Sequence, residues 1–161
     1  MTTTQARHRH LDIGSGRLIQ LGLVALTVIG ILGAAFELAT ERHWKSTEQL
    51  IPWGALALLG IAALLMLFRH SPKLVTTVRL IAVAVLLASA FGIYEHIAAN
   101  YDAGLLDQRY AATWETLPVL SRWWYALTKT VGPAPPLAPG MLGQSALLLL
   151  LATFARRTRA R

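Results

Sequence analysis

Five acidic and histidine side chains that border apolar segments are the clearest candidates for chemistry in this sequence. They are Glu37, Glu41, His43, Glu95 and His96. The chain has no cysteine, and carboxylates with imidazoles suit zinc, manganese or iron. Glu37 and Glu41 are four residues apart, so they share one helix face and can share one ion. A metal site at one end of the membrane domain is therefore one hypothesis for these residues.

Other uses of the same side chains stay open. His43 and His96 could ligate a haem, and Glu95 could relay protons. Glu95 follows about 22 Å of helix from Leu80, which would place it inside the hydrocarbon edge. In the alternative without a cofactor, Glu41 pairs with Lys45, Glu37 and Glu95 bond to neighbouring helices, and His96 bonds Asn100. That alternative is preferred over zinc, iron or haem.

The elements that must position these residues are apolar helices. Hydrophobic residues make up 55% of the 161-residue chain and charged residues 14%, against about 25% in soluble domains. A helix crosses a bilayer with about 20 apolar residues. The sequence therefore predicts an all-α polytopic membrane protein with four transmembrane helices. The expected spans are 18–40, 51–69, 72–100 and 139–156.

Charge predicts the direction of the spans, because cytoplasmic loops are enriched in lysine and arginine. With these four spans, one side of the membrane carries ten basic residues and one acid, and the other carries five basic residues and seven acids. We therefore expect residues 1–16 and 157–161 to be cytoplasmic tails, 17–156 to form the membrane domain, and 101–138 to be an outer loop. The basic excess is then a topology signal and predicts no nucleic-acid partner.

Proline and serine mark expected helix ends. Ser71 followed by Pro72 reads as an N-cap and first helical residue. Pro52 and Pro139 are expected at the starts of the second and fourth spans, where a missing N–H has no cost.

All tryptophans fall on the outer side of this topology, as an aromatic belt at the headgroups would. They are Trp44, Trp53, Trp114, Trp123 and Trp124. Large apolar residues recur at helical spacing on both sides of Pro118. This pattern predicts two short amphipathic helices in the outer interface, the first over 106–117 and the second beginning near Pro118. A stiff extended connector, 132–136, follows them.

Two further patterns concern helix packing. The order of the spans predicts two tandem helical hairpins, related as a parallel repeat. Small residues spaced by four, Gly30 and Ala34 in the first span and Ala84, Ala88 and Gly92 in the third, predict close contact between these two helices. Such contact would bring Glu37 or Glu41 near Glu95 or His96.

The stretch Phe36-Glu37-Leu38 to Glu41-Arg42-His43-Trp44, followed by Glu48-Gln49-Leu50-Ile51-Pro52, resembles small four-helix bacterial membrane proteins of uncharacterised activity. The resemblance covers the first two spans and the end of the third. It implies a four-helix membrane fold and no particular activity. Arginine outnumbers lysine 12 to 3, which is typical of proteins from GC-rich bacteria.

Two classes of function follow from these patterns. The preferred one is a non-catalytic membrane subunit that binds the lipid bilayer and a partner protein or a second copy of itself. The alternative is a protein that binds a metal, haem or solute at the outer leaflet, with or without coupling to transport. An enzyme is not expected, because no acid, base and nucleophile can be assembled. The expected location is the bacterial inner membrane.

Overall fold

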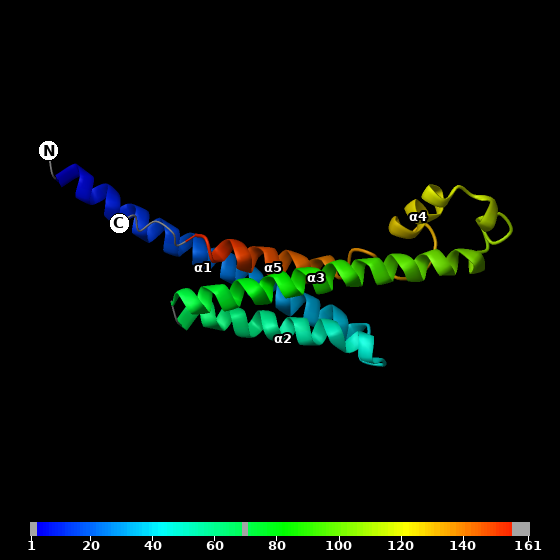
Figure 1. Ribbon diagram of the computed structural model, residues 1–161, viewed down its shortest axis with the longest axis horizontal. Helices are drawn as coiled ribbons and strands as arrows, with labels where there is room; N and C mark the ends of the chain where they lie inside the picture. The colour runs from blue at the N-terminus through cyan, green and yellow to red at the C-terminus, as the bar shows by residue number, and fades with distance from the viewer. Residues whose placement is uncertain (1–2, 69–70, 156–161) are drawn as a thin grey trace. The chain divides into compact units, whose positions relative to one another are not determined.

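The computed structural model describes residues 3–68 and 71–155, and the side chains of 15–68 and 71–155. The described backbone contains helices and turns and no strand, so the all-α prediction is confirmed. Five α-helices and two short 3-10 turns follow in chain order (Figure 1): α1 Thr3–Thr40, α2 Thr47–Phe68, α3 Pro72–Ala103, η1 Gly104–Leu106, η2 Trp114–Thr116, α4 Val119–Leu127 and α5 Gly140–Ala152.

The chain divides into two compact units. The bundle unit comprises Met1–Ala88 and Met141–Arg161, and the loop unit comprises Ser89–Gly140. The boundary falls inside α3, so one continuous helix contributes residues to both units. The bundle unit contains α1, α2, the first half of α3 and nearly all of α5. The loop unit contains the second half of α3, both 3-10 turns and α4.

Three helical segments are long and apolar enough to cross a membrane: Ser15–Thr40, Thr47–Phe68 and Pro72–Leu106. They indicate that the protein inserts into a membrane. The fourth apolar segment, α5, has 13 residues and spans about 20 Å, less than the ~30 Å of a hydrocarbon core. It begins one residue after the expected start at 139 and ends at Ala152, four residues short of the expected end.

The start of α3 confirms the predicted cap. The Ser71 hydroxyl accepts a hydrogen bond from the Leu74 N–H at 3.2 Å, and Pro72 is the first helical residue. The start of α2 was predicted too late. Ser46 and Gln49 resemble a capping box, since the Gln49 N–H donates to the Ser46 hydroxyl and the Gln49 amide accepts from the Lys45 N–H. The helix therefore begins at Thr47 and Pro52 lies inside it.

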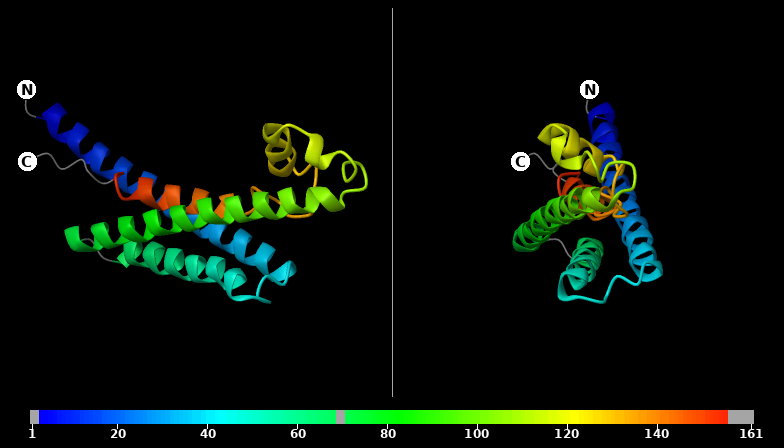
Figure 2. Two further views of the ribbon diagram at one scale, coloured as in Figure 1. Left: turned by 45° about the vertical axis from the view of Figure 1, so that its right-hand side comes forward. Right: turned by 90° about the vertical axis from the view of Figure 1, so that its right-hand side faces the viewer.

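The small residues of α1 pack against α5, not against α3 as predicted. A Cβ on Gly30 would lie 2.3 Å from the Ser145 hydroxyl, and one on Gly33 would lie 3.2 Å from the Met141 methyl. Figure 2 shows α5 beside α1 and the first half of α3. Ala84 is exposed, because α3 buries a different face. That face carries Val78, Ala82, Val85 and Ser89.

Candidate functional site

The most elaborate polar structure in the described residues joins α3 to the segment 132–139 in the loop unit. Two side chains seven residues apart on α3, about two helical turns, bond the backbone of this segment. The Ser89 hydroxyl donates to the Pro139 carbonyl at 2.7 Å, and His96 Nδ1 lies 2.7 Å from the Pro135 carbonyl oxygen. Between them, Gly92 leaves room for the Pro139 ring, which a Cβ would approach to 3.1 Å. The predicted extended connector, 132–136, and the turn that follows it are thus fixed along one face of α3. Below, the connector means the whole segment 132–139.

Asn100 is the centre of this arrangement. It is fully buried, and its amide nitrogen donates to the carbonyls of Ala126 (3.1 Å) and Ala134 (2.7 Å). Its amide oxygen accepts the Ala134 N–H at 2.9 Å. Gly132 has φ +76°, and a Cβ there would lie 2.3 Å from the Asn100 oxygen. Asn100 therefore satisfies the N–H and carbonyl of Ala134, which have no helix or sheet partner, and adds a second bond to the Ala126 carbonyl at the end of α4. The predicted alternative, a bond between His96 and Asn100, is not formed, because both side chains bond the connector.

The contact of His96 fixes its neutral tautomer. A carbonyl oxygen can only accept, so the neutral ring carries its proton on Nδ1 and presents the lone pair of Nε2. Glu95, the neighbouring residue, is exposed. The two side chains thus differ in role: His96 holds the connector and Glu95 faces away from the interior of the loop unit.

An aromatic cluster fills the interior of the loop unit. Trp114 is 2% exposed and meets Tyr101 edge to face, with ring centroids 5.6 Å apart. Trp123 lies 4.8 Å from Tyr101, measured between centroids. Gly104 permits this packing, because a Cβ there would lie 2.3 Å from the Trp114 ring. The ring of Trp114 is thus buried within the loop unit, and the place of the tryptophans in an aromatic belt stays a prediction.

The second predicted amphipathic helix is confirmed as α4, which Pro118 immediately precedes. Its inner side carries Ala126, which is fully buried, and Arg122, whose guanidinium carbon lies 5.4 Å from the Tyr101 ring centroid. Its opposite side is uncovered: Leu120 is 82% exposed and Trp124 60%. Together with Leu127, these two side chains form an apolar stripe on α4. The stripe forms part of the wall of an open groove, which is lined by Ile97, Leu120, Ser121, Trp123, Trp124, Tyr125 and Leu127.

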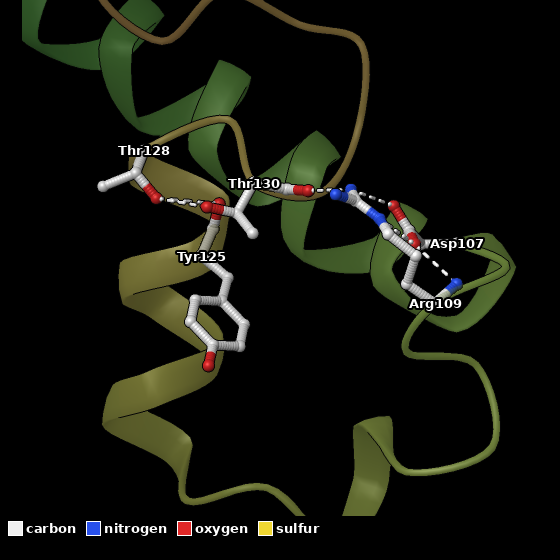
Figure 3. Close-up of polar contacts among 5 residues, drawn as sticks. All are labelled: Asp107, Arg109, Tyr125, Thr128 and Thr130. Carbon is white, nitrogen blue, oxygen red and sulfur yellow. Dashed lines mark hydrogen bonds and ion pairs between the residues drawn. The ribbon is translucent and has the colours of Figure 1, made fainter.

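The first predicted amphipathic helix is not formed. Residues 107–113 are turns between η1 and η2, because Asp107 bonds locally. Its carboxylate accepts the Arg109 N–H at 2.9 Å and pairs with the Arg109 guanidinium at 3.0 Å (Figure 3). Arg109 also donates to the Thr130 carbonyl, beyond the end of α4. The bonds from Arg109 hold the pKa of Asp107 below its usual value.

The predicted site residues of the bundle unit lie at the end of α1 and in the turn to α2. Glu37 is half-buried, whereas Glu41 is exposed and forms no ion pair with Lys45. The His43 carbonyl accepts a hydrogen bond from the Trp53 indole at 2.8 Å. Trp44 packs on Trp53 with centroids 6.4 Å apart. Trp53 therefore contacts both the backbone of the turn and the ring of Trp44. Trp44 itself is exposed.

No group of three or more histidine, aspartate and glutamate residues in the described part of the chain is placed to hold a metal ion. Metal binding by Glu37, Glu41, His43, Glu95 and His96 stays a prediction. Sequence reasoning missed Ser89 and named Asn100 only as a partner of His96, although both residues share a face of α3 with His96. The sequence does carry a signal for them, because polar residues at 89, 96 and 100 interrupt an apolar helix at helical spacing.

Comparison with known proteins assigns no relative to this chain: no family model, no curated protein and no solved structure matches it.

Proposed function

We propose that this protein is a non-catalytic assembly subunit of a bacterial inner membrane, and that the loop unit binds a partner membrane protein through α4. The observation that supports this proposal is the uncovered stripe of Leu120, Trp124 and Leu127 beside the open groove. Exposed apolar patches of this kind, rimmed by polar residues, mark interaction surfaces. Tryptophan is also the residue most enriched among those that dominate binding energy.

The composition of α4 favours a protein partner over lipid as the occupant. Helices that lie in a membrane interface are rich in lysine and arginine on their polar face. The sequence of α4 contains one charged residue, Arg122, and its guanidinium is placed over Tyr101. The charge that would bind headgroups is therefore engaged inside the loop unit, and the apolar stripe remains for a partner.

The rigidity of the loop unit supports the same function. Ser89, His96 and Asn100 fix the connector, and a Schellman motif ends α4, with the Thr130 N–H bonded to the Tyr125 carbonyl. A surface held in one conformation loses less entropy when it binds.

Variants of α4 test this proposal in native membranes. We expect the wild-type protein, extracted in mild detergent, to migrate in a complex larger than its monomer. Changing Leu120 and Leu127 together to Glu should release the monomer. Leu106→Glu is the matched control, because Leu106 is exposed on η1 and does not line the groove, and it should leave the complex intact.

Two results would overturn the proposal. One is a wild-type chain that is monomeric in cross-linked native membranes. The other is a complex that survives the double substitution. If, in addition, brominated lipids quench the tryptophan fluorescence of the wild type more than that of Trp124→Phe, the occupant of the stripe is lipid.

For the membrane topology we propose four spans, with α5 as the fourth, and both termini cytoplasmic. The unequal distribution of basic residues supports this orientation, and the packing of α5 along α1 supports its place in the bundle. The tandem-hairpin repeat stays a prediction. Because the chain lacks cysteine, single cysteines report topology without background.

Cysteine labelling in intact cells tests the topology. Gln108→Cys should react with a membrane-impermeant maleimide. Lys73→Cys and a cysteine added after Arg161 should react only after permeabilisation. The reverse pattern would overturn the orientation, and labelling of the C-terminal cysteine together with Gln108→Cys would show that α5 does not cross.

A further inference from the structure

Arg79 occupies a fixed position at one end of the bundle unit. It lies on α3 immediately before the apolar run that begins at Leu80. Its Nε donates a hydrogen bond to the Thr153 hydroxyl at 2.9 Å, and its guanidinium carbon lies 4.2 Å from the Phe154 ring centroid. Thr153 in turn donates to the Leu150 carbonyl at 2.7 Å. An arginine at a membrane boundary is usually free to extend toward water, whereas the plane of this guanidinium is fixed by two contacts.

The guanidinium keeps its charge and most of its donors. Arginine is not deprotonated in proteins, and it carries five N–H donors. One of them is engaged with Thr153, and no described residue accepts a hydrogen bond from the two Nη atoms. The helix α1 carries Asp12, eight residues before Gln20, and no other aspartate or glutamate occurs in 1–36, 49–94 or 116–161, so these segments supply no carboxylate at the level of Arg79. The counter-ion of Arg79 must therefore come from outside these segments.

A buried glutamine lies at the same depth. Gly30 faces Ser145 and Gly33 faces Met141, so α1 and α5 run antiparallel. Gln20 precedes Gly30 by ten residues and Thr153 follows Ser145 by eight, which gives about 15 Å and about 12 Å along the helices. Gln20 is only 4% exposed. This end of an otherwise apolar bundle thus contains amide, hydroxyl and guanidinium groups at one level.

We propose that Arg79 binds the phosphate group of an anionic phospholipid from the adjacent leaflet. A guanidinium binds phosphate through two parallel N–H···O bonds, and the Nη edge of Arg79 is the part left without a protein acceptor. The position at the edge of the apolar run matches the depth at which a bilayer holds its phosphates. Basic pockets between membrane helices bind such headgroups in other proteins. This inference goes beyond the proposed function, since it concerns the bundle unit and not α4.

Lipid retention measured by native mass spectrometry tests the site. The protein would be released from nanodiscs of mixed phosphatidylglycerol and phosphatidylethanolamine. We expect one phosphatidylglycerol to be retained per chain, with a preference of about tenfold over phosphatidylethanolamine. Arg79→Gln should remove this preference, and Arg79→Lys should recover only part of it, because lysine lacks the planar pair of donors.

Two further variants separate binding from folding and from general charge. Lys73→Gln removes an exposed basic residue of the same helix, and it should keep the preference. Thr153→Val removes the bond that orients Arg79 while preserving volume, and it should weaken retention several-fold with the melting temperature nearly unchanged. If Arg79→Gln fails to fold, Arg79→Lys and Thr153→Val decide the question.

The outcomes are distinct. Equal retention of the two lipids by the wild type would overturn the proposal, as would full retention by all Arg79 and Thr153 variants. Displacement of the lipid by excess inorganic phosphate would show that the site binds a soluble phosphate, which would overturn the assignment to lipid. Loss of the preference in Lys73→Gln as well would show a diffuse charge effect with no site.

Discussion

The bundle unit and the loop unit are stabilised by different physical means. In the bundle unit, most described residues lie in helices, whose backbone groups bond within the helix, and contacts between helices are mainly apolar, such as those of Leu59 and Leu149. In the loop unit, the connector has no helix of its own, and side chains of α3 bond its backbone. A bundle can exchange one apolar side chain for another with modest effect. The loop unit depends on particular polar atoms.

The two units also differ in what their glycines do. Cβ positions at Gly30 and Gly104 would each come within 2.3 Å of a neighbouring atom. At Gly30 the neighbour is the hydroxyl of Ser145, which can rotate away by giving up its bond to the Met141 carbonyl. At Gly104 it is the ring of the buried Trp114, which cannot. Equal distances thus have unequal consequences, and the comparison can be tested by substitution.

Asn100→Leu should have the largest effect and should be confined to the loop unit. It leaves the carbonyl and the N–H of Ala134 without partners, each worth about 1–3 kcal/mol when buried, and removes one of the two bonds to the Ala126 carbonyl. We expect the loop unit to lose about 3–5 kcal/mol. Hydrogen–deuterium exchange should show faster exchange over 126–139 with α1 and α2 unchanged. Gln108→Leu, at an exposed position, is the control.

Gly104→Ala should have the next largest effect on the stability of the loop unit. The added methyl forces the Trp114 ring from its contact with Tyr101, and overpacking of this kind costs about 1–3 kcal/mol. A red shift of tryptophan fluorescence and an earlier unfolding transition in detergent titration would show it. A variant with the wild-type spectrum and midpoint would mean that the loop unit is as adaptable as the bundle unit.

Gly30→Ala should change stability by less than about 1 kcal/mol, because rotation of the Ser145 hydroxyl relieves the contact and alanine favours the helix. Gly54→Ala, where nothing lies within 4 Å of the added Cβ, controls for the helix preference alone. If Gly30→Ala destabilises as much as Gly104→Ala, the α1–α5 contact is as rigid as the aromatic cluster.

The difference between the two units also explains which parts of the fold could be predicted from the sequence. Apolar runs and Ser71-Pro72 predicted the helices of the bundle unit, because helix formation depends on nearby residues. The prediction of which helix packs on the α1 glycines was wrong. By spacing alone, small residues in α1 fit small residues in α3 or α5 equally well. Only the observed contact with Ser145 distinguishes them.

In the loop unit, prediction from local sequence patterns failed where contacts between residues distant in sequence determine the backbone conformation. The spacing of Leu106, Tyr110, Trp114 and Leu117 fits a helix. The segment instead turns, because Trp114 packs on Gly104 and Arg109 reaches Thr130, 21 residues away. Asn100 bonds Ala134 across 34 residues, a distance at which spacing carries no information. The candidate surface of α4 was nevertheless predictable, because its stripe lies within one short helix.

The smallest expected effect concerns pH and the ion pair of the loop unit. Bonds from the Arg109 guanidinium and N–H lower the pKa of Asp107 in the folded chain, so the contribution of this carboxylate to stability is fully present above its unfolded pKa. It is lost as pH falls through the lowered folded value, in the acid range below the usual aspartate pKa. Because the pair is exposed, the change should be slight. The unfolding midpoint of the loop unit should therefore fall on acidification more in the wild type than in Asp107→Asn, which lacks the titrating group. Glu115→Gln removes an exposed acid of the same unit for which no partner is described, and it should titrate like the wild type. If instead Asp107→Asn and the wild type respond identically to acid, the turn around Arg109 is held by its backbone and by Thr130, and the loop unit depends on its buried amide alone.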